Sequence, residues 1–333
     1  MPKRENKIED IKDAFFPVDR RPVYTTSSKK DSNLIELPGH FAIVDAENEK
    51  AFSVVTGDYE LVTNQEAYDF AAKIMSQVFQ ATGLNDLECF NIIMPKSRSF
   101  CHIDLAKKGS EFKPWQDDKW VAFLRITNSY NRTRLLRYEL GFCRWICKNG
   151  MIFGKKSIEF SSAHIRGNVS RIHNFENNIG LIREIEATMT KKLHHLKRFY
   201  VPQKDMLGIL CKTFSIKPPE PPETPPNKTD SDQTNAYEAQ KNRAIKLRNF
   251  ARSLINEYFE DMGPHGYAAL NVLTDFATYP EGLTGGVNRV HSLQTKCGEW
   301  IDEFVESIQK PDFSFDEYLG EYREYADNLN ALL

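Results

Sequence analysis

The sequence predicts an α+β protein: an antiparallel β-meander packed with helices, followed by a Pro-rich linker and a helical C-terminal region. Polar and apolar residues alternate with a period of two through much of residues 34–62 and 89–160, as in half-buried strands. After residue 236 the apolar residues recur at helical spacing instead. Six prolines fall between these regions, in a stretch without a hydrophobic pattern. The expected parts are an N-terminal arm at 1–33, a basic α+β core domain at 34–215, a Pro-rich flexible linker or insertion at 216–236, and a helical C-terminal region at 237–333.

Within the core domain, the strands are expected as successive hairpins. The segments HFAIVD, AFSVV and YELVT are short strands, and a Gly57–Asp58 turn separates the last two. CFNIIMP and FCHIDLA flank the turn KSRS, and KWVAFLRIT and RLLRYELGFCRWIC flank the turn NSYNRT. Asn149–Gly150 is a strong signal for a hairpin turn, after which MIFG and KSIEF continue the meander.

The helical segments have recognisable ends. Thr63 and Glu66 form a capping box at the start of one helix, which Gly83 is expected to end. A second apolar stripe at helical spacing lies between Phe175 and Tyr200. Beyond the linker, further helices are expected at residues 244–259, 266–280, 287–308 and 313–332. The sequence leaves open whether these helices form a separate bundle or pack on the core.

The composition is that of a soluble globular protein. Apolar residues make up 41% and charged residues 27% of the chain, and no apolar run approaches the ~18 residues of a membrane span. The charged N-terminus is not followed by the apolar run of a secretory signal. Six scattered cysteines then indicate reduced thiols and a cytoplasmic protein. Cys143 and Cys147 lack a second Cys/His pair nearby, so neither a metal ion nor another cofactor is expected.

Charge is distributed unevenly along the chain. The formal net charge is −2, but residues 1–95 carry −6, residues 96–217 carry +14 and residues 218–333 carry −10. The sequence therefore predicts a basic central region between acidic segments, which is typical of proteins that bind polyanions. A run of charge is also the ordinary composition of a solvated surface, and charge by itself does not separate the two interpretations.

The stretch from Arg125 to Gly150 combines cations with aromatic rings. Cations contact phosphates, and flat rings stack on bases. We therefore predict that this stretch and the two lysines after it bind nucleic acid, with Tyr130 and Trp145 stacking on bases. The predicted binding residues are Arg125, Tyr130, Arg132, Arg134, Arg137, Arg144, Trp145, Lys148, Lys155 and Lys156.

Four segments give the chain a resemblance to a known family. They are YELVTNQEAYDF, VAFLRITNSYNRTRLL, FCRWICKNGM and GYAALNVLTDFATYP. In this order they resemble the bacterial phage/plasmid-like family called domain of unknown function 932, over roughly residues 50–280. The chain departs from the family pattern at Asn131–Arg132, where Asp-Gly is usual, and at Val272, where Ala is usual.

The family has no established activity, but its strand meander followed by helices is similar to the layout of single-strand annealing proteins of phage and of eukaryotic recombination. By analogy, the resemblance implies a phage/plasmid-type protein that binds single-stranded DNA and anneals it in recombination or replication. Annealing further implies a homo-oligomer, as rings or filaments. No membrane partner is expected.

Two other functions remain open. A metal-dependent nuclease or hydrolase is suggested by His102 and Asp104, which strand alternation places on one face, although such a site usually needs a third carboxylate or a lysine. A protein-binding inhibitor of a host enzyme, encoded by a mobile element, is suggested by the acidic N- and C-terminal segments. Because no complete catalytic motif is present, a binding protein is favoured over an enzyme and no catalytic residue is predicted.

Overall fold

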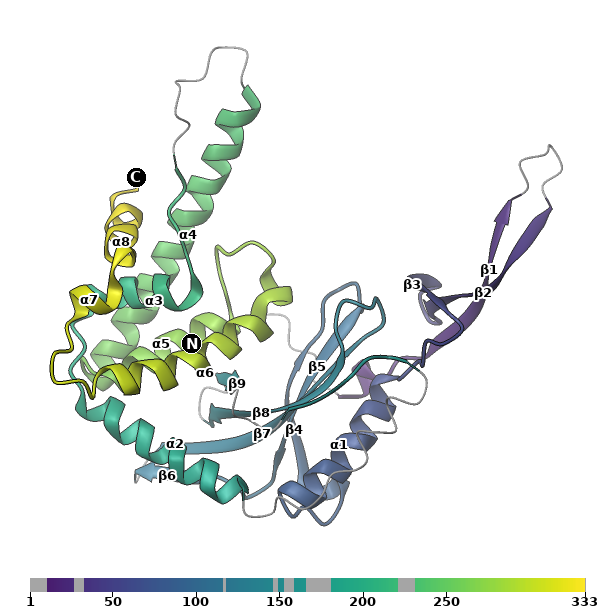
Figure 1. The fold of residues 1–333 in the computed structure, drawn as a ribbon, viewed down its shortest axis with the longest axis horizontal. Coiled ribbons are helices and arrows are strands. Elements are labelled where there is room, and N and C mark those ends of the chain that lie inside the picture. The colour runs from purple at the N-terminus through teal and green to yellow at the C-terminus, as the bar shows by residue number, and fades with distance from the viewer. Residues whose placement is uncertain are drawn as a thin grey trace. The chain divides into compact units, whose positions relative to one another are not determined.

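The computed structural model describes residues 11–26, 33–115, 118–145, 149–152, 159–165, 181–220 and 231–332 of the chain. The predicted α+β class is confirmed, because antiparallel strands form one sheet of three and one of seven and are accompanied by helices (Figure 1). Among the helices in these ranges, none is long and apolar enough to cross a membrane.

The chain forms two compact units. The first comprises Met1–Phe112, Val121–Gly141 and Lys156–Glu184, and the second comprises Lys113–Trp120, Phe142–Lys155 and Ile185–Leu333. Strands β7 (Asp118–Ser129) and β8 (Leu136–Arg144) therefore contribute residues to both units. The proline-rich segment predicted as a linker falls within the second unit.

The smaller sheet belongs to the first unit and has the strand order β1-β2-β3. Its strands are β1 (Val18–Thr26), β2 (Leu34–Asp45) and β3 (Lys50–Thr56). The first two pair antiparallel over almost their whole length and form a long hairpin (Figure 1). No strand is expected from the sequence before residue 34, because charged residues and a proline interrupt any alternation in VDRRPVYTT.

The larger sheet has the order β10-β8-β7-β5-β4, with β6 paired to β7 and β9 paired to β8. It contains both predicted hairpins, β4–β5 and β7–β8. The other strand bounds are Leu87–Ile93 for β4, Phe100–Lys107 for β5, Phe112–Trp115 for β6, Gly150–Ile152 for β9 and Glu159–Ser162 for β10. Strands β5 and β7 are buried along nearly their whole length, as expected for strands at the centre of a covered sheet.

Helix α1 (Asn64–Val78) begins at the predicted capping box. Thr63 Oγ1 accepts the N–H of Glu66 at 3.1 Å, and Glu66 Oε2 accepts the N–H of Thr63 at 2.8 Å. The helix ends before the predicted Gly83, because Gln80 already adopts a left-handed φ of 54°. The start of this helix was thus readable from the sequence, whereas its end was not.

The helices after residue 180 follow the predicted segments, with one addition, one extension and one division. The division is at Gly320, whose φ of 52° separates the helix predicted at 313–332 into two. Their bounds are Leu181–Arg198 for α2, Met206–Phe214 for α3, Ser231–Met262 for α4, Gly266–Thr278 for α5, Val290–Ser307 for α6, Phe315–Leu319 for α7 and Glu321–Ala331 for α8. Helix α3 is not predicted, and α4 begins inside the segment predicted as a linker, of which residues 221–230 lie outside the described ranges. Short 3₁₀ turns are η1 (Ile11–Ala14), η2 (Leu84–Asp86), η4 (Gln203–Asp205) and η5 (Gly286–Arg289).

Candidate nucleic-acid interface

The turn between β7 and β8 is the predicted NSYNRT turn, and its own side chains fix its geometry. Ser129 Oγ donates to the carbonyl oxygen of Arg134 at 2.9 Å and accepts the N–H of Arg134 at 3.1 Å. Asn131 Oδ1 accepts the N–H of Thr133 at 3.2 Å, which is an Asx turn. Between these bonds Arg132 adopts a left-handed φ of 61° and its side chain is exposed. Glycine adopts such a φ without strain, whereas a residue with a Cβ, such as arginine, rarely does.

Arg132 and Arg134 line a hollow in the first unit with a volume of about 390 Å³. Small-ligand sites fall in the range of roughly 300–1,000 Å³. The lining residues are Val55, Thr56, Asp58, Tyr59, Arg132, Arg134, Leu135, Ala163, His164 and Ile165. Leu135 and Ile165 are apolar yet remain 38% and 50% exposed, and Asp58 is the one carboxylate in this lining set. The hollow is therefore bordered by cations and by uncovered aliphatic side chains.

Two stacked rings, those of Tyr59 and His164, form part of the lining. Their centroids lie 5.3 Å apart and their planes are inclined by 19°. An antiparallel bridge between Tyr59 and Ile165 holds them, and the N–H of Glu60 donates to the carbonyl oxygen of His164 at 3.1 Å. The prediction that YELVT is a strand is wrong, because this segment forms only the bridge to Ile165.

The polar atoms of this ring pair are buried. Tyr59 is 9% and His164 6% exposed, and neither Tyr59 Oη nor His164 Nε2 has a hydrogen-bond partner among the residues that the structure describes. His164 Nδ1 lies 3.3 Å from the carbonyl oxygen of Glu60. Because a carbonyl only accepts, Nδ1 carries the proton there, and Nε2 of the neutral ring is left as an acceptor. A buried polar atom without a partner costs about 1–3 kcal/mol. Both atoms have almost no accessible surface, so the ring pair lines the hollow without presenting these two atoms to a ligand.

The hollow combines neutral rings with positive side chains. Burial raises the pKa of Tyr59 to about 12, an effect that the charge of Arg132 opposes, and burial lowers the pKa of His164. Both rings are therefore uncharged at neutral pH. The guanidinium of Arg134 lies 3.6 Å from the centroid of the Phe100 ring, and burial lowers the pKa of Arg134 without removing its charge. This arrangement suits an anion that is joined to a flat polar group.

Two of the residues predicted to bind nucleic acid lie in the interior of the first unit. Arg125 is buried, and its guanidinium makes two hydrogen bonds of 2.6 Å to the carboxylate of Asp104. Tyr130 is also buried: its hydroxyl accepts the N–H of Asn64 at 2.8 Å, and its ring stacks on Phe52. Strand register and core packing occupy these side chains, so the structure corrects the prediction for Arg125 and Tyr130.

Other predicted residues lie apart from the hollow. Arg137 is 4.0 Å from a carboxylate on its own strand, and Arg144, in the second unit, pairs with an aspartate of β7 at 2.7 Å. Trp145 is half-buried. Lys148, Lys155 and Lys156 lie outside the described ranges. Of the predicted residues that the structure describes, Arg132 and Arg134 are the two that line the hollow.

Sequence reasoning misses the two rings of the hollow. Tyr59 falls in a segment predicted as an ordinary strand, and His164 follows the last predicted strand of the meander. No local motif marks either residue. Their proximity depends on a bridge between segments that are far apart in the chain, which spacing does not reveal.

The residues behind the nuclease prediction lie inside the larger sheet, where both His102 and Asp104 are buried. Asp104 accepts hydrogen bonds from Arg125 and, at 2.9 Å, from Asn91 Nδ2. His102 Nδ1 lies 2.8 Å from Thr127 Oγ1. Across the described ranges, no group of three His, Cys, Asp or Glu side chains is placed to hold a metal ion. We therefore assign His102 and Asp104 to the stability of the sheet.

Comparison with known proteins places the chain in a family. The family model for the domain of unknown function 932 matches residues 51–282, a range that contains the whole lining of the hollow. The chain belongs to this family. The resemblance seen in the sequence is thereby confirmed. No curated protein and no solved structure matches the chain, and the similarity to single-strand annealing proteins stays a prediction.

Asparagines in the motifs of the domain of unknown function 932 form buried hydrogen-bond networks. In the first unit, Asn128 Nδ2 donates to Asn64 Oδ1 and to the carbonyl oxygen of Val62, both at 2.9 Å. In the second unit, Asn149 Nδ2 donates to Tyr258 Oη at 3.3 Å. These residues stabilise the fold. The hollow instead adjoins the turn at which this chain departs from the family pattern.

Proposed function

We propose that this protein binds single-stranded nucleic acid, with single-stranded DNA preferred, at the hollow lined by Arg132 and Arg134. The observation that carries the proposal is that two cationic side chains line one hollow together with a stacked pair of uncharged rings, Tyr59 and His164, and with uncovered aliphatic side chains. Arginine contacts phosphate through charge-assisted hydrogen bonds.

The preference for single strands follows from the access that a recess requires. In a duplex the base edges are paired and the base faces are stacked, whereas a base of a single strand can leave its stack and enter a pocket. The uncovered side chains of Leu135 and Ile165 then contact the face of that base. A duplex offers the hollow only its phosphates, so it is expected to bind more weakly.

The direct test is fluorescence anisotropy with labelled single-stranded DNA, duplex DNA and RNA of about 30 nucleotides, a length that exceeds the site size of common single-strand binders. Each protein is titrated across a salt series. The double variant Arg132→Ala/Arg134→Ala is compared with Lys50→Ala/Lys96→Ala, which removes two exposed charges of the same unit outside the hollow.

Loss of two phosphate contacts is expected to flatten the slope of log K against log salt by about 1.4, because each contact contributes about 0.7 with single strands. The lysine variant is expected to keep the wild-type slope. An equal change in both variants would show that diffuse charge, and not the hollow, holds the nucleic acid. Equal affinity for duplex DNA would remove the single-strand preference.

The wider role that we attach to this binding is annealing of complementary strands in phage or plasmid recombination or replication, by a cytoplasmic homo-oligomer. It rests on the expectation, from the sequence, that the family layout is similar to that of annealing proteins. The test is the rate at which two complementary labelled strands pair with and without protein, together with sedimentation of the protein with and without single-stranded DNA. A protein that binds single strands as a monomer and does not accelerate pairing would retain the binding proposal and refute annealing.

A further inference from the structure

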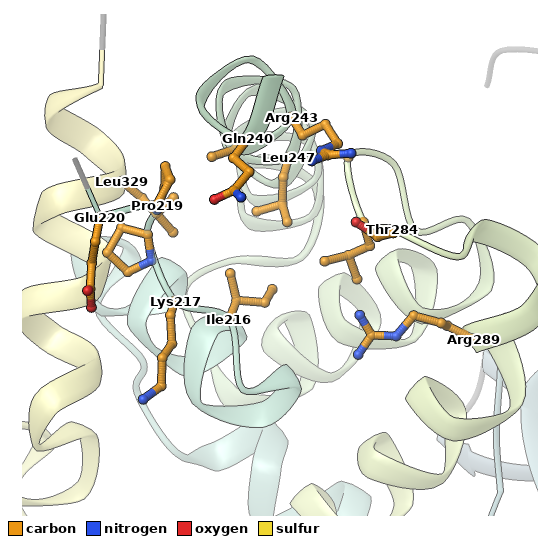
Figure 2. Close-up of a pocket in the computed structure, with 14 residues that line it drawn as sticks. Ile216, Lys217, Pro219, Glu220, Gln240, Arg243, Leu247, Thr284, Arg289 and Leu329 are labelled. Atoms are coloured by element: carbon orange, nitrogen blue, oxygen red, sulfur yellow. The ribbon is translucent and has the colours of Figure 1, made fainter. Parts of the chain in front are cut away.

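A second hollow, with a volume of about 450 Å³, lies within the second unit between helix α4, the chain after α3 and the loop that leads into α6 (Figure 2). Its lining includes Ile216, Gln240, Arg243, Leu247, Thr284 and Arg289. In Figure 2 the side chains of Gln240 and Arg289 extend toward the space between these elements, and those of Ile216 and Leu247 border it. Glu220 also belongs to the lining and brings a carboxylate to it, so one wall is apolar and the others carry polar and charged side chains of both signs.

The loop that forms one wall is fixed against α4 by a glycine. Gly282 has a φ of 79°, and a Cβ at this position would lie 2.6 Å from the backbone nitrogen of Leu247 and 2.8 Å from the carbonyl oxygen of Arg243. Real Cβ atoms do not approach backbone atoms so closely, so only glycine lets the loop rest directly on the helix. This contact sets the width of the hollow at its α4 side.

The two arginines of this hollow form no ion pair with a carboxylate of the described residues, although Glu220 belongs to the same lining. Within the described ranges, no carboxylate lies within 4.0 Å of the guanidinium of Arg243 or Arg289. They nevertheless belong to a segment, residues 218–333, whose net charge is −10. Both guanidinium groups can therefore face a bound anion, and Glu220 is the one carboxylate of the described lining near them.

Two lysines next to this hollow have hydrogen-bond partners of their own. Burial and the charge of Arg289 lower the pKa of Lys296, whose Nζ lies 3.0 Å from Ser215 Oγ. Lys217, by contrast, is hydrogen-bonded to the Tyr325 side chain, and this bond raises its pKa. Lys217 therefore has its own partner, and the charges left for a ligand are those of Arg243 and Arg289.

We infer that this hollow binds a small organic phosphate. Two guanidinium groups on different elements match the double negative charge of a phosphate monoester, to which arginine donates pairs of hydrogen bonds. Gln240 and Thr284 add polar atoms, and Ile216 and Leu247 contact the organic part of the ligand. The site is separate from the nucleic-acid hollow and does not depend on the function proposed for it.

The test is isothermal titration calorimetry on the full chain at low salt, with phenyl phosphate, inorganic phosphate and phthalate as probes. Phthalate carries a similar charge on carboxylates and so separates phosphate recognition from general anion binding. The variant Arg243→Gln/Arg289→Gln is compared with Lys246→Gln/Lys310→Gln, which removes two exposed charges of the second unit outside the hollow. Thermal unfolding of each variant verifies that it is folded.

Phenyl phosphate is expected to bind more tightly than inorganic phosphate, and the arginine variant is expected to lose about tenfold or more in affinity, since a hydrogen bond to a charged group contributes about 1.5–3 kcal/mol. The lysine variant and Arg132→Ala/Arg134→Ala are expected to bind phenyl phosphate as the wild type does. The inference is overturned if no probe binds, if phthalate binds as tightly as phenyl phosphate, or if the arginine variant retains full affinity. Unchanged binding of single-stranded DNA by the arginine variant would show that the two sites act independently.

Discussion

Each of the two hollows is lined by two arginines, one acidic residue and aliphatic side chains, and the hollows differ in how the arginines are held and in which other groups accompany them. In the first unit, Arg132 and Arg134 stand on a single turn, next to stacked rings whose polar atoms lack partners in the described ranges. In the second unit, Arg243 and Arg289 come from α4 and η5, and an aliphatic wall accompanies them. A pair of guanidinium groups favours an anionic ligand. The side chains around the pair indicate which chemical group that anion is attached to.

Net charge along the chain does not predict where these pairs occur. The segment of +14 uses Arg125 and Arg144 in ion pairs with aspartates, whereas the segment of −10 holds Arg243 and Arg289, which no described carboxylate neutralises. The number of cations in a segment is therefore a poor guide to anion binding. The better guide is the number of cations that form no ion pair within the folded protein. Substitutions in each class of arginine site test this distinction.

The largest effect is expected from Asp104→Ala, which contrasts an interior arginine with one in a hollow. Removing the carboxylate leaves Arg125 buried and unpaired by Asp104, which costs about 3–5 kcal/mol. Arg134→Ala removes a half-buried cation above the Phe100 ring and is expected to cost about 1 kcal/mol or less. Urea unfolding, monitored by circular dichroism, measures the free energy of unfolding of both variants. Similar losses in the two variants would contradict the division of arginines into structural and binding groups.

A smaller loss is expected from Gly282→Ala, which alters the second hollow alone. The new Cβ meets backbone atoms of Leu247 and Arg243 and also strains a positive φ, at a total cost of about 2–3 kcal/mol. Gly263→Ala is the matched control, because its φ is 90° but nothing lies within 4 Å of the added Cβ, so it bears only the backbone cost of about 1–2 kcal/mol. Phenyl phosphate binding should be lost in the first variant and kept in the second. If Gly282→Ala binds and unfolds as Gly263→Ala does, contact with α4 does not shape the hollow.

The smallest change in stability is expected from Arg132→Gly, which alters the charge of the first hollow without disturbing its turn. Glycine relieves the left-handed φ of 61° but increases the entropy of the unfolded chain, so the variant should be unchanged or up to about 1 kcal/mol more stable. Its salt slope for single-stranded DNA should fall by about 0.7. Arg132→Lys keeps the charge and should keep the slope. If Arg132→Gly is more stable than the wild type and binds single-stranded DNA with the same affinity, Arg132 is not part of the binding site.

The hairpins and the capping box could be predicted because their determinants are local. Alternation over a few residues and the chemistry of the NSYNRT turn specify β7 and β8, and Thr63 with Glu66 specifies the start of α1. Strand β1 could not be predicted, because its residues gain a strand conformation only by pairing with β2. Local sequence therefore gave most of the larger sheet and less of the smaller one.

The candidate site was predicted only in part, because its members come together through strand register. Arg125 looks like a free cation in the sequence, but it faces Asp104 across β5 and β7 in the register of the folded sheet. Tyr59 and His164 meet through a bridge that no spacing rule anticipates. Arg132 and Arg134 were found because a turn is a local feature, and turns expose the residues they carry.

Tyr130 determines how far the sequence of the NSYNRT turn can change without loss of its structure. Its ring stacks on Phe52, its hydroxyl receives the N–H of Asn64, and its carbonyl oxygen accepts Ser53 Oγ at 2.7 Å. The residue just before Asn131–Arg132 is thus anchored by contacts that do not involve Arg132. Position 132 can therefore exchange arginine for glycine while the scaffold stays intact. The charge of this turn can then change without a cost in the stability of the protein.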